Sequence, residues 1–470
     1  MHAIKHNDAA RLVFSHGTLL FDGVSRETIR THFAGIPWQW DERVGQWRCD
    51  AIWYSEIIGL LDDSSTQVEN LVPQQPSVHW PYVAIHPLRE EQRKALAAWM
   101  PIGKGVVVMP TGTGKTEVAL TIMQQTAVST LVVCPVRDLM YQWHHRILEG
   151  LGYDAGIIGD NTFNVRPVSV TTYDSACIHM GKLGAQFKLL IFDECHHLPG
   201  PMRRDAALMS IAPMRLGLTA TPERSDNRHL DLQGLIGPIV YALPMAEVKG
   251  RTLADYEVVR IPVHLSPEEQ TTYDRLAGEV RNYMHLKVRE TPGYSWQDLC
   301  AEAGKDPECR KTQKAFHAKT AIEDRAEEKL RVLEDLFRLH ADDRVLVFTG
   351  SNAMAREVSK RFLVPCLLNH CRKKERGDIL DGFKKAEYKV IAANQVLDEG
   401  VDIPEAKIAI VVGGQTSVKQ AKQRLGRILR KQADAKATLY EVVCAETREE
   451  QRSRQRRRSD AYAGTRHRRI

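Results

Sequence analysis

The chain contains 470 residues, 43% of them hydrophobic, and carries a formal net charge of +6. That length exceeds what one hydrophobic core usually serves, so we expect about two to four domains. No apolar run is long enough for a membrane span, and the opening residues lack the apolar stretch of a secretory signal, which argues against a membrane or secreted protein. Nine cysteines are scattered without a CxxC pair, which predicts reduced thiols and a cytoplasmic location.

The first half of the chain divides into two regions by pattern. Residues 1–75 contain short strand-like runs and four of the eight tryptophans, namely Trp38, Trp40, Trp47 and Trp53. We expect these rings to fill the core of a small sheet, although exposed rings could stack on unpaired bases. Residues 76–245 alternate short β-branched runs with helical stretches, which predicts a parallel sheet covered on both faces.

The second half contains a helical region and then a second set of buried runs. Residues 246–340 are expected to form a linker and a helical insertion, whose first helix begins at the capping box Ser266–Glu269. Residues 341–447 return to the strand–helix alternation of a second α/β lobe. Residues 448–470 carry much of the excess positive charge and predict a basic tail, which either binds phosphate groups or only solubilises the chain.

A glycine-rich loop follows a buried strand in the first lobe. The run "GVVV" precedes "MPTGTGKTEVAL" (109–120), which continues with helical spacing, although Met109 stands where the strict pattern has its first glycine. This setting predicts a P-loop, or Walker A motif, for ATP. Lys115 would neutralise the β- and γ-phosphates and Thr116 would bind Mg²⁺. The predicted nucleotide-binding residues of the loop are Thr111, Gly112, Thr113, Gly114, Lys115 and Thr116.

An acidic motif, "FDECHHLPG" (192–200), ends another buried run. We expect Asp193 to bind Mg²⁺ directly or through water, and Glu194 to orient and deprotonate the attacking water. A zinc site is disfavoured because neighbouring strand residues point to opposite faces, and the protease spacing HExxH is absent. His196 and His197 become candidates for sensing the γ-phosphate, with a structural role as the alternative.

The second lobe contains "QRLGRILR" (423–430), in which Arg427 and Arg430 share one helical face. Either arginine could act as an arginine finger that stabilises charge on the transferred phosphoryl group. Gln423 would hold a phosphate or the attacking water, and Gly400 with Asp402 would meet the ribose. Because these groups lie on the other lobe, hydrolysis requires the lobes to close, and opening afterwards would move one lobe along a strand.

These motifs resemble those of superfamily 2 helicases, and most closely the XPB family. The matching stretches occur in the family's order: "LREEQRKAL", "TGTGKT", "VVCPVRDLMYQW", "VTTYDSA", the DExH box "DECHH", "LTATP", "VLVFTGS", "NQVLDEGVDIP" and "QRLGRILR". The resemblance implies an α/β fold with two RecA-like parallel-sheet lobes at 76–245 and 341–447. It also implies a damage-recognition-like α+β domain at 1–75 and a thumb-like insertion within 246–340.

The resemblance assigns further residues. It places Arg89 and Gln92 on the adenine side of the nucleotide. It implies contact with DNA, or coupling of hydrolysis to that contact, for Arg137, Thr172, His196, His197, Thr219, Thr221, Arg224, Asp226 and Gln395. The family's strand-separating Arg-Glu-Asp element corresponds here to Arg224, Ser225 and Asp226, and the missing glutamate argues against splitting of a duplex by this element. Only two cysteines lie between Lys115 and Asp193, too few for the four thiolates of an iron–sulphur cluster.

The leading hypothesis is an ATP- and Mg²⁺-dependent 3′–5′ DNA helicase or translocase of nucleotide excision repair, acting on single-stranded, forked or damaged DNA. One alternative is an ATP-gated clamp that opens duplex DNA locally without processive movement. Another is the motor subunit of a restriction system with a nuclease partner, since the E-x-K triplets at 247–249 and 327–329 lack the setting of a nuclease centre. RNA also stays open as the preferred substrate, because backbone contacts do not distinguish the sugars.

Overall fold

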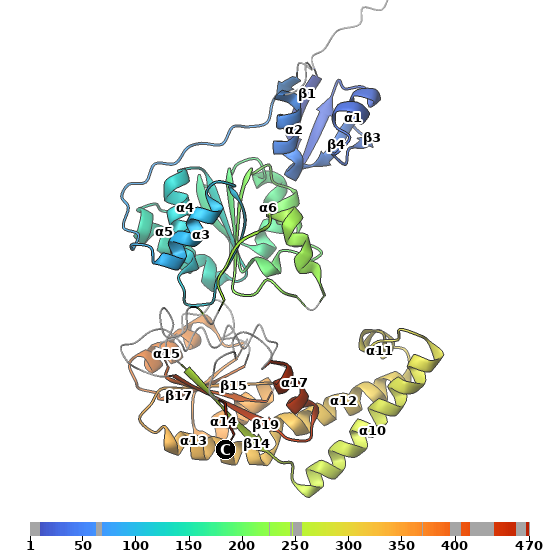
Figure 1. Ribbon diagram of the computed structural model, residues 1–470, viewed down its shortest axis with the longest axis vertical. Helices are drawn as coiled ribbons and strands as arrows, with labels where there is room; N and C mark the ends of the chain where they lie inside the picture. Colours follow the sequence, from blue (N-terminus) through green and yellow to red (C-terminus); the bar gives the residue numbers. More distant parts are fainter. Residues whose placement is uncertain are drawn as a thin grey trace, which may run out of the picture. The chain divides into compact units, whose positions relative to one another are not determined.

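The computed structural model describes residues 10–62, 68–224, 226–244, 247, 256–368, 370–394, 406–413, 437–456 and 467–469. The chain forms two compact units, Met1–Pro244 and Met245–Ile470 (Figure 1). The first unit contains a five-stranded and an eight-stranded sheet, and the second contains a seven-stranded sheet. The predicted α/β fold with two parallel-sheet lobes is therefore confirmed. No described helix combines the length and the apolar character needed to cross a bilayer.

The small N-terminal sheet has the strand order β3-β4-β2-β1-β5. Alternating burial in β2 points Leu19 and Phe21 into a core closed by the two helices. Three tryptophans pack against this core as predicted, whereas Trp40 lies on the edge strand with 51% of its surface exposed. The elements are β1 (Ala10–Ser15), β2 (Thr18–Asp22), α1 (Arg26–His32), β3 (Gln39–Asp41), β4 (Gln46–Asp50), η1 (Ala51–Trp53), α2 (Tyr54–Asp62) and β5 (Val68–Asn70).

The N-terminal sheet is docked on the first lobe. Ala185 and Ile211, from the loops that precede β11 and β12, belong to the N-terminal core. The fit is close, because a β-carbon at Gly184 would lie 2.9 Å from Phe14 Cζ. These loops stand at the amino ends of the parallel strands, whereas the P-loop follows a carboxyl end. The small domain therefore packs on the edge of the sheet opposite the predicted nucleotide site.

The first lobe is built on the strand order β13-β6-β12-β11-β7-β10-β8-β9, in which all pairs but β8–β9 are parallel. The central strands β7, β10 and β11 are buried along their whole length, as their β-branched runs predict. The strands are β6 (Lys104–Val108), β7 (Thr130–Cys134), β8 (Gly156–Gly159), β9 (Thr162–Phe163), β10 (Val168–Thr172), β11 (Leu189–Asp193), β12 (Met214–Thr219) and β13 (Ile239–Ala242). The helices are α3 (Glu90–Trp99), α4 (Lys115–Thr126), α5 (Arg137–Leu151), α6 (Tyr173–Leu183), α7 (Asp205–Leu208) and α8 (Leu232–Leu235), with short 3₁₀ turns η2 (Cys195–His197) and η3 (Arg228–Asp231).

The second lobe is an all-parallel sheet with the order β16-β17-β15-β18-β19-β14-β20. Its core joins the apolar faces of β15, β18 and β19 to helix α13, including Leu333, Val347, Ile410 and Val442. The strands are β14 (Tyr256–Val263), β15 (Val345–Thr349), β16 (Cys366–Leu367), β17 (Val390–Ala393), β18 (Ile408–Val412), β19 (Ala437–Cys444) and β20 (His467–Arg469). The helices are α13 (Glu327–Leu339), α14 (Asn352–Phe362), α15 (Lys373–Lys384) and α17 (Arg448–Arg456).

The helical insertion leaves this sheet after β14 and returns to it through α13 (Figure 1). It consists of α10 (Pro267–Glu290), α11 (Trp296–Glu302) and α12 (Pro307–Arg325), with Leu276, Val280 and Ala315 packed between the long helices. The predicted capping box is present, because Ser266 Oγ accepts from Glu269 N at 3.3 Å and Glu269 Oε2 accepts from Ser266 N at 2.8 Å.

Two segments belong to the second lobe although the predicted boundaries, 341–447, leave them out. Strand β14 pairs with β19 along its full length, from Tyr256 opposite Ala437 to Val263 opposite Cys444. Helix α17, the start of the predicted basic tail, buries Glu449 and Ser453. The physical reason is pairing over a long sequence separation, which local charge and hydropathy do not reveal. The insertion therefore interrupts the second lobe and does not precede it.

Candidate nucleotide-binding and coupling site

The P-loop has the backbone that its glycines allow. Gly112 and Gly114 adopt left-handed conformations, with φ of 85° and 79°, and helix α4 begins at Lys115. A β-carbon at Gly114 would lie 2.3 Å from Gln92 Nε2, so the site needs a residue without one. The loop therefore turns its backbone at the end of β6, and Thr116 stands in the first turn of α4. This is the strand–loop–helix setting that the sequence predicts.

The side chain of Gln92 on α3 stabilises the P-loop through hydrogen bonds to its backbone. This side chain is buried, and Nε2 donates to Thr113 O at 2.8 Å and to Gly114 O at 3.3 Å. Its Oε1 accepts from Arg89 N at 2.8 Å, which closes the first turn of α3. The amide thus joins α3 to the loop, a role that the sequence did not suggest. The adenine contacts of Arg89 and Gln92 stay predictions.

The polar groups of the loop are partly satisfied within it. Lys115 Nζ donates to Met109 O at 3.1 Å, and Thr113 Oγ1 donates to Pro110 O at 2.7 Å. Thr111 Oγ1 is buried and has no hydrogen-bond partner among the described residues. A buried hydroxyl without a partner is costly unless a bound group completes it. The loop therefore fits a polar ligand.

Asp193 is a buried carboxylate at the carboxyl end of β11. Trp143 Nε1 donates to its Oδ2 at 2.8 Å, and Glu194 N donates to its Oδ1 at 3.0 Å. Burial and the charge of Glu194 raise the pKa of Asp193 from 3.8 to about 6, against the lowering effects of Trp143 and Lys115. Keeping this buried carboxylate charged costs free energy. A bound cation would offset that cost, so the setting favours one.

Two residues that position Asp193 were missed by the sequence analysis. Trp143 reaches it from α5, and the hydroxyl of Tyr173 on α6 donates to Asp193 O at 3.0 Å. Both rings are nearly fully buried. Trp143 ends the quoted run "VVCPVRDLMYQW", but its spacing alone gives no sign that α5 turns the indole toward β11.

The DExH residues and the "LTATP" motif form one chain of contacts. Glu194 has a left-handed backbone with φ of 48°, and its Oε2 lies 3.4 Å from His196 Nδ1. The same ring nitrogen lies 3.0 Å from Thr219 Oγ1. Thr219 Oγ1 in turn donates to Thr221 O at 3.1 Å and accepts from Thr221 N at 3.1 Å.

The chain of contacts continues to the predicted strand-separating element. Arg224 NH1 donates to His196 O at 2.7 Å. Its other donors form a two-fold pair with Asp226, at 2.9 and 2.7 Å. The sequence-predicted residues Glu194, His196, Thr219 and Arg224 are therefore brought together.

His197 packs beside His196, with ring centroids 4.3 Å apart. Its Nδ1 lies 3.3 Å from an Arg203 nitrogen, and Arg203 also pairs with Asp174 at 3.1 Å. The ring lies 6.1 Å from that of Tyr173. The ring of His197 therefore contacts both α6 and the ring of His196.

The predicted strand-contacting residues of the first lobe lie at the same edge of the sheet. Arg137 begins α5 after β7 and pairs with Asp160 at 2.6 Å. Thr172 ends β10 and caps α6, where its Oγ1 accepts from Ser175 N at 3.2 Å. Carboxyl ends of parallel strands meet at one edge, which is where open α/β sheets bind ligands. Lys115, Asp193 and Thr219 share that edge.

Other predicted site residues lie outside the described residues. They are Ser225, Gln395, Gly400, Asp402, Gln423, Arg427 and Arg430.

Comparison with known proteins identifies the family. Residues 12–72 match the Xeroderma pigmentosum group B helicase damage recognition domain, and residues 311–464 match the ERCC3/RAD25/XPB C-terminal helicase. Residues 85–224 match the Type III restriction enzyme, res subunit. The DNA 3'-5' translocase XPB2 of Sulfurisphaera tokodaii is 38% identical over 424 residues, which cover 89% of this chain and 95% of that protein. The chain belongs to the XPB helicase family.

More distant XPB-family proteins are longer than this chain. The DNA 3'-5' helicases XPB of Kineococcus radiotolerans and Mycobacterium tuberculosis are 29% and 28% identical, and each match covers 80% of this chain. The chain spans only 63% and 64% of these two proteins.

Solved helicase structures share the fold of this superfamily 2 helicase. The Pyrococcus furiosus Hef helicase domain matches with a TM-score of 0.53 at 15% identity, covering 78% of this chain and 98% of that one. Saccharomyces cerevisiae Dbp5 bound to RNA and ADP BeF3 matches with a TM-score of 0.56 at 14% identity, covering 81% and 89%. At these identities the likeness supports the fold alone.

Proposed function

We propose that this XPB-family helicase is an ATP- and Mg²⁺-dependent DNA translocase that moves 3′ to 5′. The single observation that carries the proposal is the buried carboxylate of Asp193, whose pKa is raised by burial and by Glu194 and lowered by the charge of Lys115. A lysine and two carboxylates at the edge of a parallel sheet complement a nucleotide phosphate paired with a divalent cation.

Particular residues would hold the nucleotide and its ion. Mg–ATP would supply the phosphoanhydride bond whose cleavage drives movement. Backbone N–H groups of the loop 111–116 would bind phosphate oxygens, Lys115 would neutralise them, and Thr116 with Asp193 would hold the ion. The left-handed glycines and the buried, unpartnered Thr111 hydroxyl support this assignment.

Glu194 is the proposed general base. Its Oε2 is buried and forms no hydrogen bond to a described residue, with His196 Nδ1 as a neighbour at 3.4 Å, so it can accept a proton from water. Its backbone is left-handed, with φ of 48°, and such backbone strain is often found at functional sites.

The contacts of His196 are the proposed route from hydrolysis to movement. A change at Glu194 would reach Thr219 through the imidazole and Arg224 through the His196 carbonyl. Thr219 ends β12 and Thr221 follows it, beside the edge where Arg137 and Thr172 would contact a strand. The route consists of direct contacts of 3.4 Å or less.

DNA as the substrate and the 3′–5′ direction rest on the family. The names of the relatives specify DNA and that direction. The match of residues 12–72 to a damage recognition domain supports single-stranded, forked or damaged DNA as the substrate and nucleotide excision repair as the process. Such a role suits a cytoplasmic protein with nine unpaired cysteines.

The roles proposed for the second-lobe motifs rest on the sequence. From the sequence motifs, Arg427 or Arg430 would stabilise transition-state charge, Gln423 would hold a phosphate or water, Gly400 and Asp402 would meet the ribose, and Gln395 would couple the site to DNA.

The deciding experiment measures ATP turnover with single-stranded, forked and duplex DNA side by side, together with strand displacement on the fork. We expect single-stranded DNA to stimulate turnover and the fork to be opened. A matching single-stranded RNA, tested in parallel, should stimulate less. Turnover that ignores all three DNAs would contradict the proposal.

One observation favours a second candidate, a clamp that opens duplex DNA locally. Arg224 donates to both carboxylate oxygens of Asp226 and to the His196 carbonyl, so its side chain is held against the DExH turn. A clamp would hydrolyse ATP on DNA and open a short bubble but would fail to displace a long annealed strand. The same fork assay therefore separates the two candidates.

A nuclease activity, if it accompanies the motor, is proposed to come from a separate protein. Glu327 begins helix α13 and pairs with Arg361 at 2.9 Å, and Lys329 is fully buried. The triplet 327–329 therefore lacks the strand setting of a metal-dependent nuclease. Co-purification with a nuclease would test this partner.

A further inference from the structure

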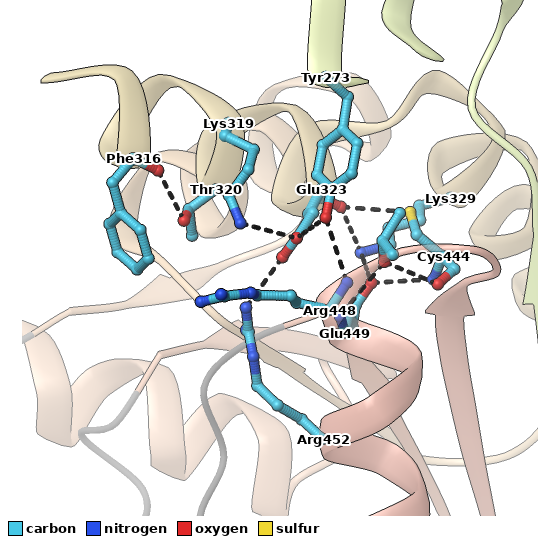
Figure 2. Close-up of polar contacts among 11 residues, drawn as sticks. Tyr273, Phe316, Lys319, Thr320, Glu323, Lys329, Cys444, Arg448, Glu449 and Arg452 are labelled. Carbon is cyan, nitrogen blue, oxygen red and sulfur yellow. Dashed lines mark hydrogen bonds and ion pairs between the residues drawn. The ribbon is translucent and has the colours of Figure 1, made fainter. Parts of the chain in front are cut away.

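A buried network of charges joins the helical insertion to the second lobe (Figure 2). Its carboxylates are Glu323, Asp324 and Glu449, and its cations are Lys319, Lys329 and Arg452. They come from α12, α13 and α17, and five of the six are at most 7% exposed. So many charges are rarely removed from water together unless each is paired.

Glu323 is the hub on the insertion side. Its Oε1 accepts from the Tyr273 hydroxyl of α10 at 2.7 Å, and its Oε2 accepts from Arg452 of α17 at 3.0 Å. The Tyr273 hydroxyl also accepts from Arg448 N at 3.1 Å. Figure 2 shows these side chains meeting between the insertion and the first turns of α17. One carboxylate therefore ties both long helices of the insertion to α17.

Lys329 is the hub on the lobe side. Its Nζ donates to Glu449 Oε2 at 2.8 Å and to Glu323 O at 2.6 Å. Glu449 Oε2 also accepts from Cys444 N, at the end of β19, at 2.8 Å. Burial is the largest single effect and would lower the pKa of Lys329, but the charge and hydrogen bond of Glu449 together with other neighbours, including Asp324, raise it above its ordinary value. The contacts of Lys329 and Glu449 therefore join helix α13, helix α17 and the end of strand β19.

The network also approaches the end of β18. A β-carbon at Gly413 would lie 2.8 Å from Asp324 Oδ1 and 3.0 Å from Lys329 Nζ. Asp324 accepts a hydrogen bond from Ser351 Oγ, which caps α14 after β15. The base of the insertion is therefore packed against the carboxyl edge of the second sheet, where β15, β18 and β19 end.

A network of this kind favours one geometry over others. An apolar joint would tolerate sliding, because packing is non-directional, whereas each charge here loses its partner if α12 shifts against α17. Removing one member leaves the others buried without compensation, so the arrangement resists gradual bending. The insertion and the lobe would therefore keep a fixed angle.

We propose that α17 is a latch that fixes the helical insertion to the second lobe, with Glu323 and Arg452 as positioning residues, so that insertion and lobe move as one body. The mechanical consequence rests on the proposed translocase function, because a rigid joint transmits lobe movement to nucleic acid. The latch itself does not rest on it. The segment that the sequence predicts as a basic tail thereby begins with a structural part of the motor.

The test uses the full chain with Arg452→Gln, Glu323→Gln and the double variant. Amide hydrogen exchange in α10 and α12 should rise by about tenfold in each single variant, and the double variant should add little more, because the two residues act as a pair. Exchange in β15, in the core of the second lobe, should stay unchanged, which shows that this lobe remains folded. Arg452→Lys should restore most of the protection.

The matched control is an exposed pair on the same insertion, Arg275 and Glu279, whose side chains lie 2.6 Å apart. Arg275→Gln and Glu279→Gln should leave exchange within about twofold of the wild type, as exposed pairs contribute little. Unchanged exchange in Arg452→Gln, or fully additive effects in the double variant, would overturn the latch.

A second readout separates positioning from folding. Base pairs displaced per ATP should fall by about fivefold in Arg452→Gln while ATP turnover without DNA stays near wild type, because coupling and not chemistry is lost. If Arg452→Gln raises amide exchange but displaces as many base pairs per ATP as the wild type, the proposed transmission of lobe movement to nucleic acid is wrong. Absence of DNA-stimulated turnover in the wild type would instead refute the translocase, and the exchange experiment would still decide the latch.

Discussion

The indole of Trp143 donates a hydrogen bond to the carboxylate of Asp193 at 2.8 Å, across the space between α5 and the end of β11. It lowers the pKa of a group that burial and Glu194 raise to about 6. The carboxylate that would hold the ion thus depends on a residue 50 positions earlier in the chain.

Trp143→Phe should move the acid limb of ATP turnover to higher pH. Asp193 has to be charged to hold a cation, so turnover should fall as pH drops through about 6 in the wild type. Loss of the donor raises this pKa further, by about one unit, because hydrogen bonds to charged groups contribute about 1.5 kcal/mol or more. A pH–rate profile measures the shift.

Trp99→Phe is the control for Trp143→Phe. Trp99 is also buried, but its indole donates to Arg215 O at 3.0 Å, away from the carboxylates. The variant Trp99→Phe should lower the free energy of unfolding without shifting the pH–rate profile of ATP turnover. If Trp143→Phe does not shift the pH–rate profile of ATP turnover, the role proposed for the Trp143 indole is wrong.

Lys115→Ala should abolish ATP turnover while DNA binding stays measurable. The variant removes the positive charge expected at the phosphates, and the backbone of α4 should tolerate alanine. Turnover and fluorescence-based DNA binding are measured on the same preparation. Lys94→Ala, which removes an exposed partner of Glu90 on α3, should change neither. Persistent turnover in Lys115→Ala would remove the P-loop assignment.

Thr219→Val should separate hydrolysis from its stimulation by DNA. Valine keeps the shape but removes the hydroxyl that contacts His196 and Thr221. We expect turnover without DNA to persist and stimulation by single-stranded DNA to fall by about tenfold, as the loss of one buried hydrogen bond allows. Thr130→Val is the control. Thr130 begins β7, and its Oγ1 donates to Val128 O, at the sheet edge opposite to the one where Thr219 lies. Intact stimulation in Thr219→Val would exclude this route.

Gly184→Ala should destabilise the first unit, and Gly278→Ala should not. A β-carbon at Gly184 would lie 1.9 Å from Met209 O, where the N-terminal sheet packs on the lobe. We expect a loss of about 1–3 kcal/mol in the free energy of unfolding. Gly278 lies inside α10 with open space around it, so alanine should stabilise that helix by about 0.5–1 kcal/mol. Denaturant unfolding measures both, and equal effects would contradict the close packing at Gly184.

Arg430→Ala should lower the rate of hydrolysis much more than ATP affinity. An arginine finger acts on charge that develops in the transition state, and its removal costs about 10³-fold or more in rate. Single-turnover rates and ATP titrations distinguish the two effects. Arg331→Ala, which removes an exposed partner of Glu328, is the control. Equal losses in rate and affinity would argue against the finger.

The sequence by itself determined the features that depend on local spacing. Gly112, Gly114 and Lys115 sit where a strand, a phosphate loop and a helix follow each other, and left-handed glycine is a local requirement. Asp193 at the end of a buried run and the capping box at Ser266 are likewise local. The order of the motifs was enough to indicate the α/β class and the family.

Only the tertiary structure decided which distant residues meet. Nothing in the spacing places Trp143 on Asp193, Gln92 on the P-loop or Arg452 on Glu323, because such contacts depend on strand order and helix direction. Strand β14 and helix α17 join the second lobe for the same reason, although their sequences predict a linker and a tail. Local patterns specify elements, whereas burial and pairing across the fold determine their partners.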